Sequence, residues 1–158
     1  MNPLVLAIIL TIVPVIELRG GLPVALINAS KEGVSQGLVF LIIVSLNILM
    51  IFAAFFFLDY LHKFFLNLKT YKKFYEFTLR KMQKKIDHFE KSHDSIGLWA
   101  LFLFVAVPLP LTGAYSGVLL SWLFNLPRKK SIIAIACGVL VAGIIVYIGT
   151  IGVTSFLG

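Results

Sequence analysis

The segment Glu17-Leu-Arg-Gly-Gly-Leu-Pro23 decides the fold, because it interrupts an apolar stretch that extends over residues 3–29. A second interruption, Pro108-Leu-Pro-Leu-Thr-Gly113, divides the apolar stretch 96–126. Proline removes a backbone donor and disfavours helix at the residue before it, and glycine weakens a helix interior. The sequence therefore predicts that each stretch is a pair of short helices joined by a tip.

The composition places these helices in a membrane. Hydrophobic residues make up 59% of the 158 residues and charged residues 13%, against about 45–50% and about 25% in an ordinary soluble domain. A water-soluble domain of this length has too little interior to bury so much apolar surface. The composition therefore excludes a water-soluble enzyme and predicts an all-α integral membrane protein.

Helix length separates two kinds of apolar stretch. Residues 34–60 and 131–157 are uninterrupted, and each is long enough to cross a bilayer as one helix. Each half of an interrupted stretch is only about 12–15 residues, or about 18–22 Å, against a hydrocarbon core of about 30 Å. We therefore expect residues 3–29 and 96–126 to be re-entrant hairpins, which return to the side from which they enter.

The basic residues indicate the orientation. Nine of the fourteen lie between Lys63 and Lys91, and three form the run Arg128-Lys129-Lys130. Four simple spans would put these clusters on opposite sides, whereas re-entrant hairpins put both on one side, which is then cytoplasmic. The sequence predicts a multi-pass cell-membrane protein with residues 61–95 in the cytoplasm and both termini outside.

The same order of elements occurs twice. Residues 1–60 and 96–158 each form a hairpin followed by a transmembrane helix, and the two hairpins enter from opposite sides. Transporters use such inverted repeats to build a midplane site from broken helices. Between the repeats, apolar residues recur at gaps of three and four within residues 61–95. This spacing predicts an amphipathic helix on the inner leaflet, in contact with anionic lipids.

Two charged residues are expected deep in the bilayer. A charge there costs about 2.5–3.5 kcal/mol on insertion scales, and such residues usually mark a functional site. Glu17 and Arg19 either form an ion pair that pins the hairpin or act separately on a ligand. Asn47, in the stretch 34–60, needs a polar partner, which the tips would supply.

The tips are predicted to bind an anion. Gly20 and Gly21 fit a tight turn, Pro23 suits the first turn of the return helix, and Thr112 is placed to cap the second return helix. Tyr115 either orients a ligand or packs against the opposite hairpin. Free N–H groups at each helix start favour negative charge. The expected substrate-binding residues are Glu17, Arg19, Gly20, Gly21, Pro23, Pro108, Pro110, Thr112, Gly113, Tyr115 and Gly117.

These features favour a transporter that moves an amphiphile by alternating access. Arg19 would bind an anionic, phosphate-like head group while the tail stays in lipid. Glu17 could instead serve a lipophilic cation or carry a coupling proton, which would fit proton-coupled export of small drugs. A third alternative is a non-transporting scaffold that gathers lipids or proteins through residues 61–95. We expect no enzymatic activity, no metal site, no cofactor and no nucleic-acid partner. A homodimer is expected, because two full spans cover a midplane site thinly.

Two segments resemble a known family. Glu17-Leu-Arg-Gly-Gly-Leu-Pro23 and Pro108-Leu-Pro-Leu-Thr-Gly-Ala-Tyr-Ser-Gly117 closely resemble the paired signatures of the prokaryotic small multidrug export proteins. That family is similar to the DedA/VTT membrane proteins, which share paired re-entrant hairpins. The DedA resemblance implies movement of lipids, including polyprenyl phosphates, and the family name implies drug efflux. DedA-type proteins carry arginines near the second hairpin, whereas residues 108–117 contain no charge.

Overall fold

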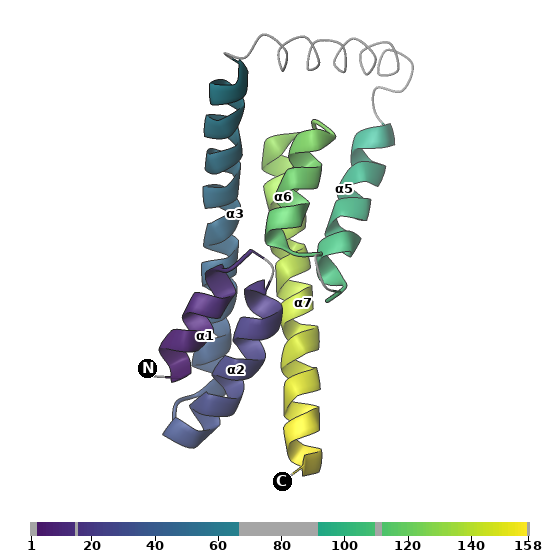
Figure 1. Cartoon of the computed structure of the whole chain (residues 1–158). Helices are drawn as coiled ribbons and strands as arrows, with labels where there is room; N and C mark the ends of the chain where they lie inside the picture. Colours follow the sequence, from purple (N-terminus) through teal and green to yellow (C-terminus); the bar gives the residue numbers. More distant parts are fainter. Residues whose placement is uncertain (1–2, 15, 67–91, 110–111, 158) are drawn as a thin grey trace.

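The computed structural model describes residues 3–14, 16–66, 92–109 and 112–157, and all of the regular structure in these ranges is helical. Two helices are long and the other four are shorter (Figure 1). The helices are α1 (Pro3–Ile12), α2 (Glu17–Glu32), α3 (Gln36–Leu66), α5 (Ser92–Ala106), α6 (Ala114–Leu123) and α7 (Arg128–Leu157). The predicted amphipathic helix falls mainly on residues 67–91, outside the described residues, and the ends of the segment 61–95 instead belong to α3 and α5.

α1 and α2 form the first helix pair, and the turn between them lies at residues 13–16. The backbone N–H of Glu17 donates to the carbonyl oxygen of Val13 at 2.9 Å, which closes this turn. α2 therefore begins earlier than predicted, and Gly20, Gly21 and Pro23 lie inside the helix. The prediction that Gly20 and Gly21 form the tip was wrong, and Pro23 lies beyond the first turn of the helix in which it was placed.

Close helix packing explains Gly21. A Cβ atom on Gly21 would overlap the side chain of Thr11 and lie 2.9 Å from the carbonyl oxygen of Ala7. α1 can approach α2 at this point only because the side chain is missing. The residues that look like a chain reversal in the sequence thus allow two helices to pack.

α5 and α6 form the second pair, and here the predicted break is confirmed. The chain leaves helical geometry after Ala106 and enters α6 at Ala114. Short-range hydrogen bonds, such as that from the Thr112 N–H to the Leu109 carbonyl oxygen at 3.2 Å, shape the tip. Of the two prolines expected in this tip, Pro108 is described and Pro110 lies outside the described residues.

α3 and α7 run along the molecule from end to end, and the two short pairs occupy opposite halves beside them (Figure 1). At 31 and 30 residues these helices are about 45 Å long. Each contains an apolar window long enough to cross a membrane. The predicted stretches 34–60 and 131–157 were short at one end: α3 continues to Leu66, and Arg128 already starts α7.

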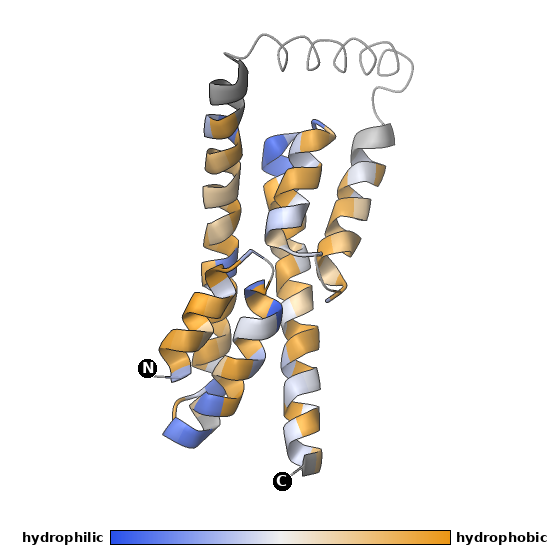
Figure 2. Ribbon diagram, viewed as in Figure 1, coloured by the Kyte–Doolittle hydropathy of each residue, from blue (hydrophilic) through white to orange (hydrophobic). Residues whose placement is uncertain are grey.

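The surface has the character of a protein in contact with lipid. Large apolar side chains such as Phe56 (73% exposed) and Trp99 (67% exposed) point outward, and hydrophobic residues cover much of the length of the helices (Figure 2). The buried core consists of aliphatic side chains where the helices cross, including Leu22, Ile51 and Ile135. Such extensive apolar exposure is unfavourable in water and favours a membrane-associated protein.

The two ends of the molecule carry different segments of the chain. The start of α1 and the end of α7 lie at the same end in Figure 1. At the other end, Arg128 pairs with Asp59 of α3 and lies over the ring of Phe55, 4.9 Å from its centroid. The basic run at the start of α7 is thus at the end where α3 finishes and α5 begins. Which side of the membrane each end faces stays a prediction.

Candidate functional site

The carboxylate of Glu17 lies on the N-terminus of α6. One oxygen (Oε2) accepts a hydrogen bond from the Ala114 N–H at 2.9 Å and the other (Oε1) accepts one from the Tyr115 N–H at 3.0 Å. These are N–H groups without a partner inside their own helix, and the positive end of the helix dipole adds to their attraction for an anion. Glu17 is only 4% exposed. Its buried carboxylate is stabilised by two backbone N–H groups that lie 97 and 98 positions away in the sequence.

The backbone at Glu17 is strained. Its φ angle is 48°, and among the described non-glycine residues only Glu17 and Asn125 have a positive φ. Side-chain crowding in left-handed geometry costs about 1–2 kcal/mol per residue. The surrounding contacts hold Glu17 in this conformation, and backbone strain of this kind concentrates at functional sites.

Gly113 leaves the space that the carboxylate occupies. A Cβ atom at this position would overlap the Glu17 carboxylate. Gly113 is also the N-cap of α6, and its N–H donates to the Ser116 hydroxyl at 2.7 Å. The predicted Thr112 cap was therefore wrong. Because Glu17 already accepts from the first N–H groups of α6, the helix start does not need the Thr112 hydroxyl.

Arg19 reaches the same tip by a different route. Its Nη2 donates to the Thr112 hydroxyl at 2.8 Å and to the Val107 carbonyl oxygen at 3.2 Å. In the described part of the chain the salt bridge is the one between Arg128 and Asp59, so Glu17 and Arg19 do not form a contact ion pair. Both side chains extend from α2 to the α5–α6 tip, and they bind different groups there.

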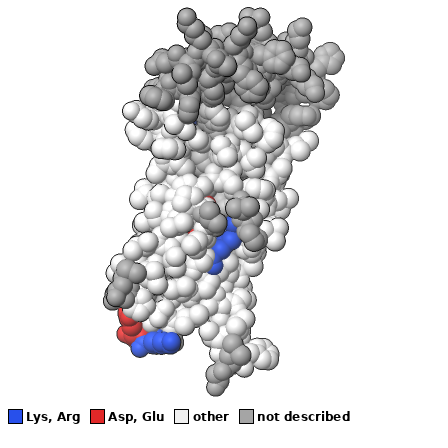
Figure 3. All heavy atoms as spheres, viewed as in Figure 1, with Lys and Arg blue, Asp and Glu red and all other residues white. Residues whose placement is uncertain are grey.

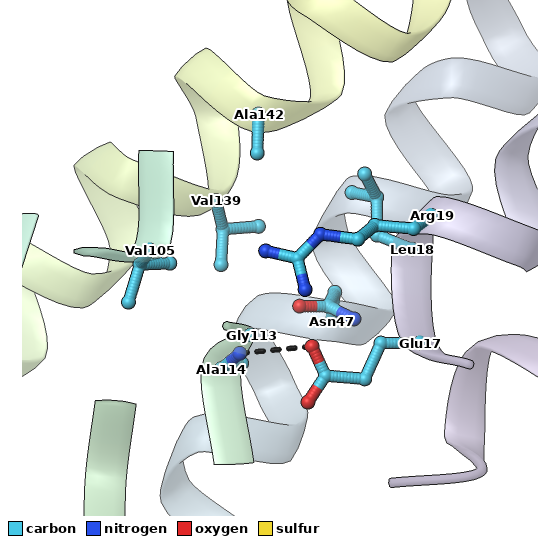
Figure 4. Close-up of a pocket in the computed structure, with 9 residues that line it drawn as sticks. All are labelled: Glu17, Leu18, Arg19, Asn47, Val105, Gly113, Ala114, Val139 and Ala142. Carbon is cyan, nitrogen blue, oxygen red and sulfur yellow. Dashed lines mark hydrogen bonds between the residues drawn. The ribbon is translucent and has the colours of Figure 1, made fainter. Parts of the chain in front are cut away.

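Glu17 and Arg19 also line a small pocket between the helices (Figure 4). The free volume of the pocket is about 10 Å³, which is about the space that one water molecule needs. Five helices contribute to its wall. The lining residues are Glu17, Leu18, Arg19, Asn47, Val105, Gly113, Ala114, Val139 and Ala142.

Two donors in this pocket have no acceptor among the residues that the structure describes. The side-chain nitrogen Nδ2 of Asn47, a residue 1% exposed, has no hydrogen-bond partner, and neither has the buried Nε of Arg19. Asn47 does reach the tips, where its partner was expected, but Nδ2 finds none. Since a buried donor without a partner costs about 1–3 kcal/mol, the pocket is short of an acceptor group.

The other predicted residues have packing roles or lie outside the pocket wall. The Tyr115 hydroxyl donates to the Ile12 carbonyl oxygen at 2.8 Å, so this side chain packs against the opposite pair. Gly117 lies against Val105 and Ile135, where a side chain would separate three helices. Gly20, Gly21, Pro23 and Pro108 are absent from the pocket wall.

Sequence reasoning missed the apolar part of the wall. Val105, Val139 and Ala142 are aliphatic residues within apolar stretches, and no local signal distinguishes them from residues that face lipid. Ala114 contributes its backbone N–H, which any non-proline residue offers. Only the meeting of the helices makes these positions part of a site.

Comparison with known proteins identifies a family. A search of the curated proteins and a search of the solved structures found no match. The sequence model of a family described as "Putative small multi-drug export protein" matches residues 17–145. The matched range starts at Glu17 and includes every residue of the pocket wall. The chain belongs to the small multi-drug export protein family.

Proposed function

We propose that this protein translocates an amphiphile with an anionic, phosphate-like head group, such as a polyprenyl phosphate, across the membrane by alternating access. Membership of the small multi-drug export family suggests a membrane export or transport role, and the substrate class is our inference. It rests on one observation, the position of the Arg19 guanidinium where the two helix pairs meet.

Among the described residues, no carboxylate forms a salt bridge with Arg19. Its hydrogen-bond partners, Thr112 and Val107, offer uncharged oxygen atoms. A cation near the centre of a bilayer costs about 2.5–3.5 kcal/mol and usually pairs or faces a wet cavity. An anionic head group would provide the pairing that the protein leaves open, and a planar guanidinium can bind phosphate oxygens in bidentate fashion.

Access from the side favours a substrate with a lipid tail. Figure 3 shows basic atoms about half-way along the molecule, well separated from the charged group at its lower end. The Arg19 guanidinium lies at the α5–α6 tip, where it contacts Val107 and Thr112. Arg19 is only partly buried. A head group could reach it while the tail remains in the hydrocarbon.

The two helix pairs supply the moving parts in this proposal. Each repeat consists of a re-entrant pair and one long helix, in opposite orientation, and rocking of one repeat against the other would open the pocket to either side. With room for about one water molecule, the pocket corresponds to a closed state. We also propose a cytoplasmic location for residues 61–95, termini outside, and a relationship to the DedA/VTT proteins.

A homodimer would complete the cover of the site. The single cysteine, Cys137, is exposed on α7, so a cross-link between two copies through Cys137 reports an approach of two α7 helices. We expect covalent dimers after oxidation in membranes and none from Cys137→Ser.

The transport proposal is tested in liposomes loaded with labelled polyprenyl phosphate, with a membrane-impermeant phosphatase outside. We expect the wild-type protein to expose substrate well beyond the outer-leaflet half, and Arg19→Ala to stop this. Arg128→Ala is the matched control, because it removes an arginine at one end of the molecule and should retain translocation. Exposure at the level of empty liposomes with the wild-type protein would contradict the proposal.

Proton-coupled export of small lipophilic drugs is the second candidate. The buried carboxylate of Glu17, 4% exposed, favours it, because a carboxylate inside a membrane can carry a proton. In liposomes with an imposed pH gradient, this alternative predicts accumulation of a lipophilic dye that Glu17→Gln abolishes. Glu32→Gln, at the exposed end of the same helix, is the control. No accumulation by the wild-type protein would exclude it.

A further inference from the structure

The position of Glu17 on α6 has the geometry of a bound ligand. Two carboxylate oxygens accept from two consecutive N–H groups, those of Ala114 and Tyr115, at 2.9 and 3.0 Å. Free carboxylates, sulfates and phosphates bind helix N-termini through the same groups. α6 has 10 residues, so its dipole is developed. Glu17 differs from a free anion only in being attached to the opposite helix pair.

Unused donors around the carboxylate show that it does not complete the site. The amide Nδ2 of Asn47 and the Nε of Arg19 are buried without partners among the described residues, and both residues line the same pocket. Figure 4 shows the Asn47 side chain between the Arg19 guanidinium and the Glu17 carboxylate. Four donors are therefore available at this place, two from α6 and one each from Asn47 and Arg19. A carboxylate has two oxygens that can accept from these donors. A phosphate monoester has three terminal oxygens and can therefore accept from more of them.

Backbone strain favours departure of the carboxylate. Glu17 has a φ of 48°, a geometry that costs about 1–2 kcal/mol. Release of Glu17 from α6 would allow the backbone to relax, which offsets part of the lost hydrogen bonding. Gly113, where a Cβ would overlap the carboxylate, leaves the approach to α6 open.

We propose that the N-terminus of α6, together with Asn47 and Arg19, binds the phosphate group of the substrate, and we call this binding site the seat. In this proposal Glu17 is an intramolecular competitor that is displaced when the phosphate binds. This inference rests on the proposed function and names the binding groups within it. It also explains the small size of the pocket, since a phosphate and the carboxylate cannot occupy the seat together. Phosphate cannot bind while Glu17 occupies the seat. The apparent affinity for phosphate is therefore the intrinsic affinity multiplied by the fraction of molecules in which the seat is free.

Equilibrium binding by the full-length protein in detergent micelles tests this. The probes are farnesyl phosphate, inorganic phosphate and, as the uncharged control, farnesol, at an ionic strength fixed with chloride. In Glu17→Gln, the carboxylate is replaced by a neutral group of the same shape. We expect the Kd for farnesyl phosphate to fall at least about tenfold relative to the wild-type protein. Glu32→Gln, which removes a carboxylate from the exposed end of α2, should bind as the wild-type protein does.

A second substitution identifies the seat. Adding Asn47→Leu to Glu17→Gln should reverse most of the gain, because the phosphate then loses one of its donors. Glu17→Ala should show the same gain as Glu17→Gln, which keeps the test valid if one variant fails to fold. Helix content by circular dichroism and a single peak in size exclusion establish folding.

The outcomes separate this inference from the transport proposal. Unchanged affinity in both folded Glu17 variants overturns the inference, whatever the liposome assay shows. Tighter binding without translocation by the wild-type protein supports the seat and contradicts transport. Farnesyl phosphate binding more tightly than inorganic phosphate assigns the seat to a lipid head group, and equal affinities assign it to free phosphate.

Discussion

The two tips meet at one place but contribute opposite kinds of group. From the α1–α2 side come the charged side chains of Glu17 and Arg19. From the α5–α6 side come neutral groups: the N–H groups of Ala114 and Tyr115, and the oxygen atoms of Thr112 and Val107. Residues 108–117 carry no charge at all.

This difference makes each tip dependent on the other. The charges of one pair are stabilised by dipoles of the other, so separating the tips exposes two ions and several backbone groups together. A hydrogen bond to a charged group contributes about 1.5–3 kcal/mol. Contacts of this strength hold the tips together and would still allow them to part in the proposed transport cycle.

The largest effect is expected from a side chain at Gly113. Gly113→Ala places a Cβ atom where the Glu17 carboxylate lies, so the carboxylate must leave the start of α6. Overpacking and the lost charged hydrogen bonds should lower the free energy of unfolding by about 3 kcal/mol. Unfolding in micelles, followed by circular dichroism, measures this change.

Gly149→Ala is the control, because a Cβ atom on Gly149 has nothing within 4 Å and alanine favours helix. It should be neutral or slightly stabilising. In a Glu17→Ala background, the cost of Gly113→Ala should shrink by more than about 1 kcal/mol, as expected for residues in contact. Equal costs in both backgrounds would show that the two tips do not meet through this pair.

The Arg19 contact should give the next largest effect. Thr112→Val removes the hydroxyl that accepts from Arg19 Nη2 at 2.8 Å and leaves only the Val107 carbonyl oxygen. We expect a loss of about 2 kcal/mol in unfolding free energy, while Thr112→Ser keeps the hydroxyl and most of the stability. If Ser and Val variants unfold alike, the hydroxyl does not hold the guanidinium.

Sequence reasoning predicted the two tips unequally well. The break at Pro108–Gly113 was correct, because two prolines close together leave few helical alternatives. The first break was displaced, since a glycine such as Gly21 is a signal both for a turn and for close helix packing. Only the approach of α1 distinguishes the two, and that is a tertiary contact.

The site was predicted in outline. Glu17 and Arg19 were identified from their charge in an apolar stretch, and the structure places both at the tips. Their partners were beyond sequence reasoning, because backbone N–H and carbonyl groups occur at every residue and only the fold selects Ala114, Tyr115 and Val107.

A smaller effect on stability, but a clear one on function, is expected at Asn47. Asn47→Leu replaces a buried donor without a partner by an apolar side chain of similar size. Stability should rise by about 1 kcal/mol, and translocation in the liposome assay should fall. Asn28→Leu is the comparison, because Asn28 Nδ2 already donates to the Val24 carbonyl oxygen at 2.7 Å, and translocation should persist. A transport rate unchanged by Asn47→Leu would remove Asn47 from the site.

The smallest effect on stability is expected at the exposed Arg128–Asp59 ion pair. Comparing it with the buried contacts at the tips shows how much burial strengthens those contacts. Its side chains are 52% and 39% exposed, so water and salt screen the attraction, and the Phe55 ring continues to hold Arg128. Asp59→Asn should therefore cost less than about 0.5 kcal/mol, and less still at high salt. Unfolding in micelles at low and high salt measures both. A loss as large as that of Thr112→Val would mean that burial is not what makes the tip contacts strong, and charge alone would then have to account for them.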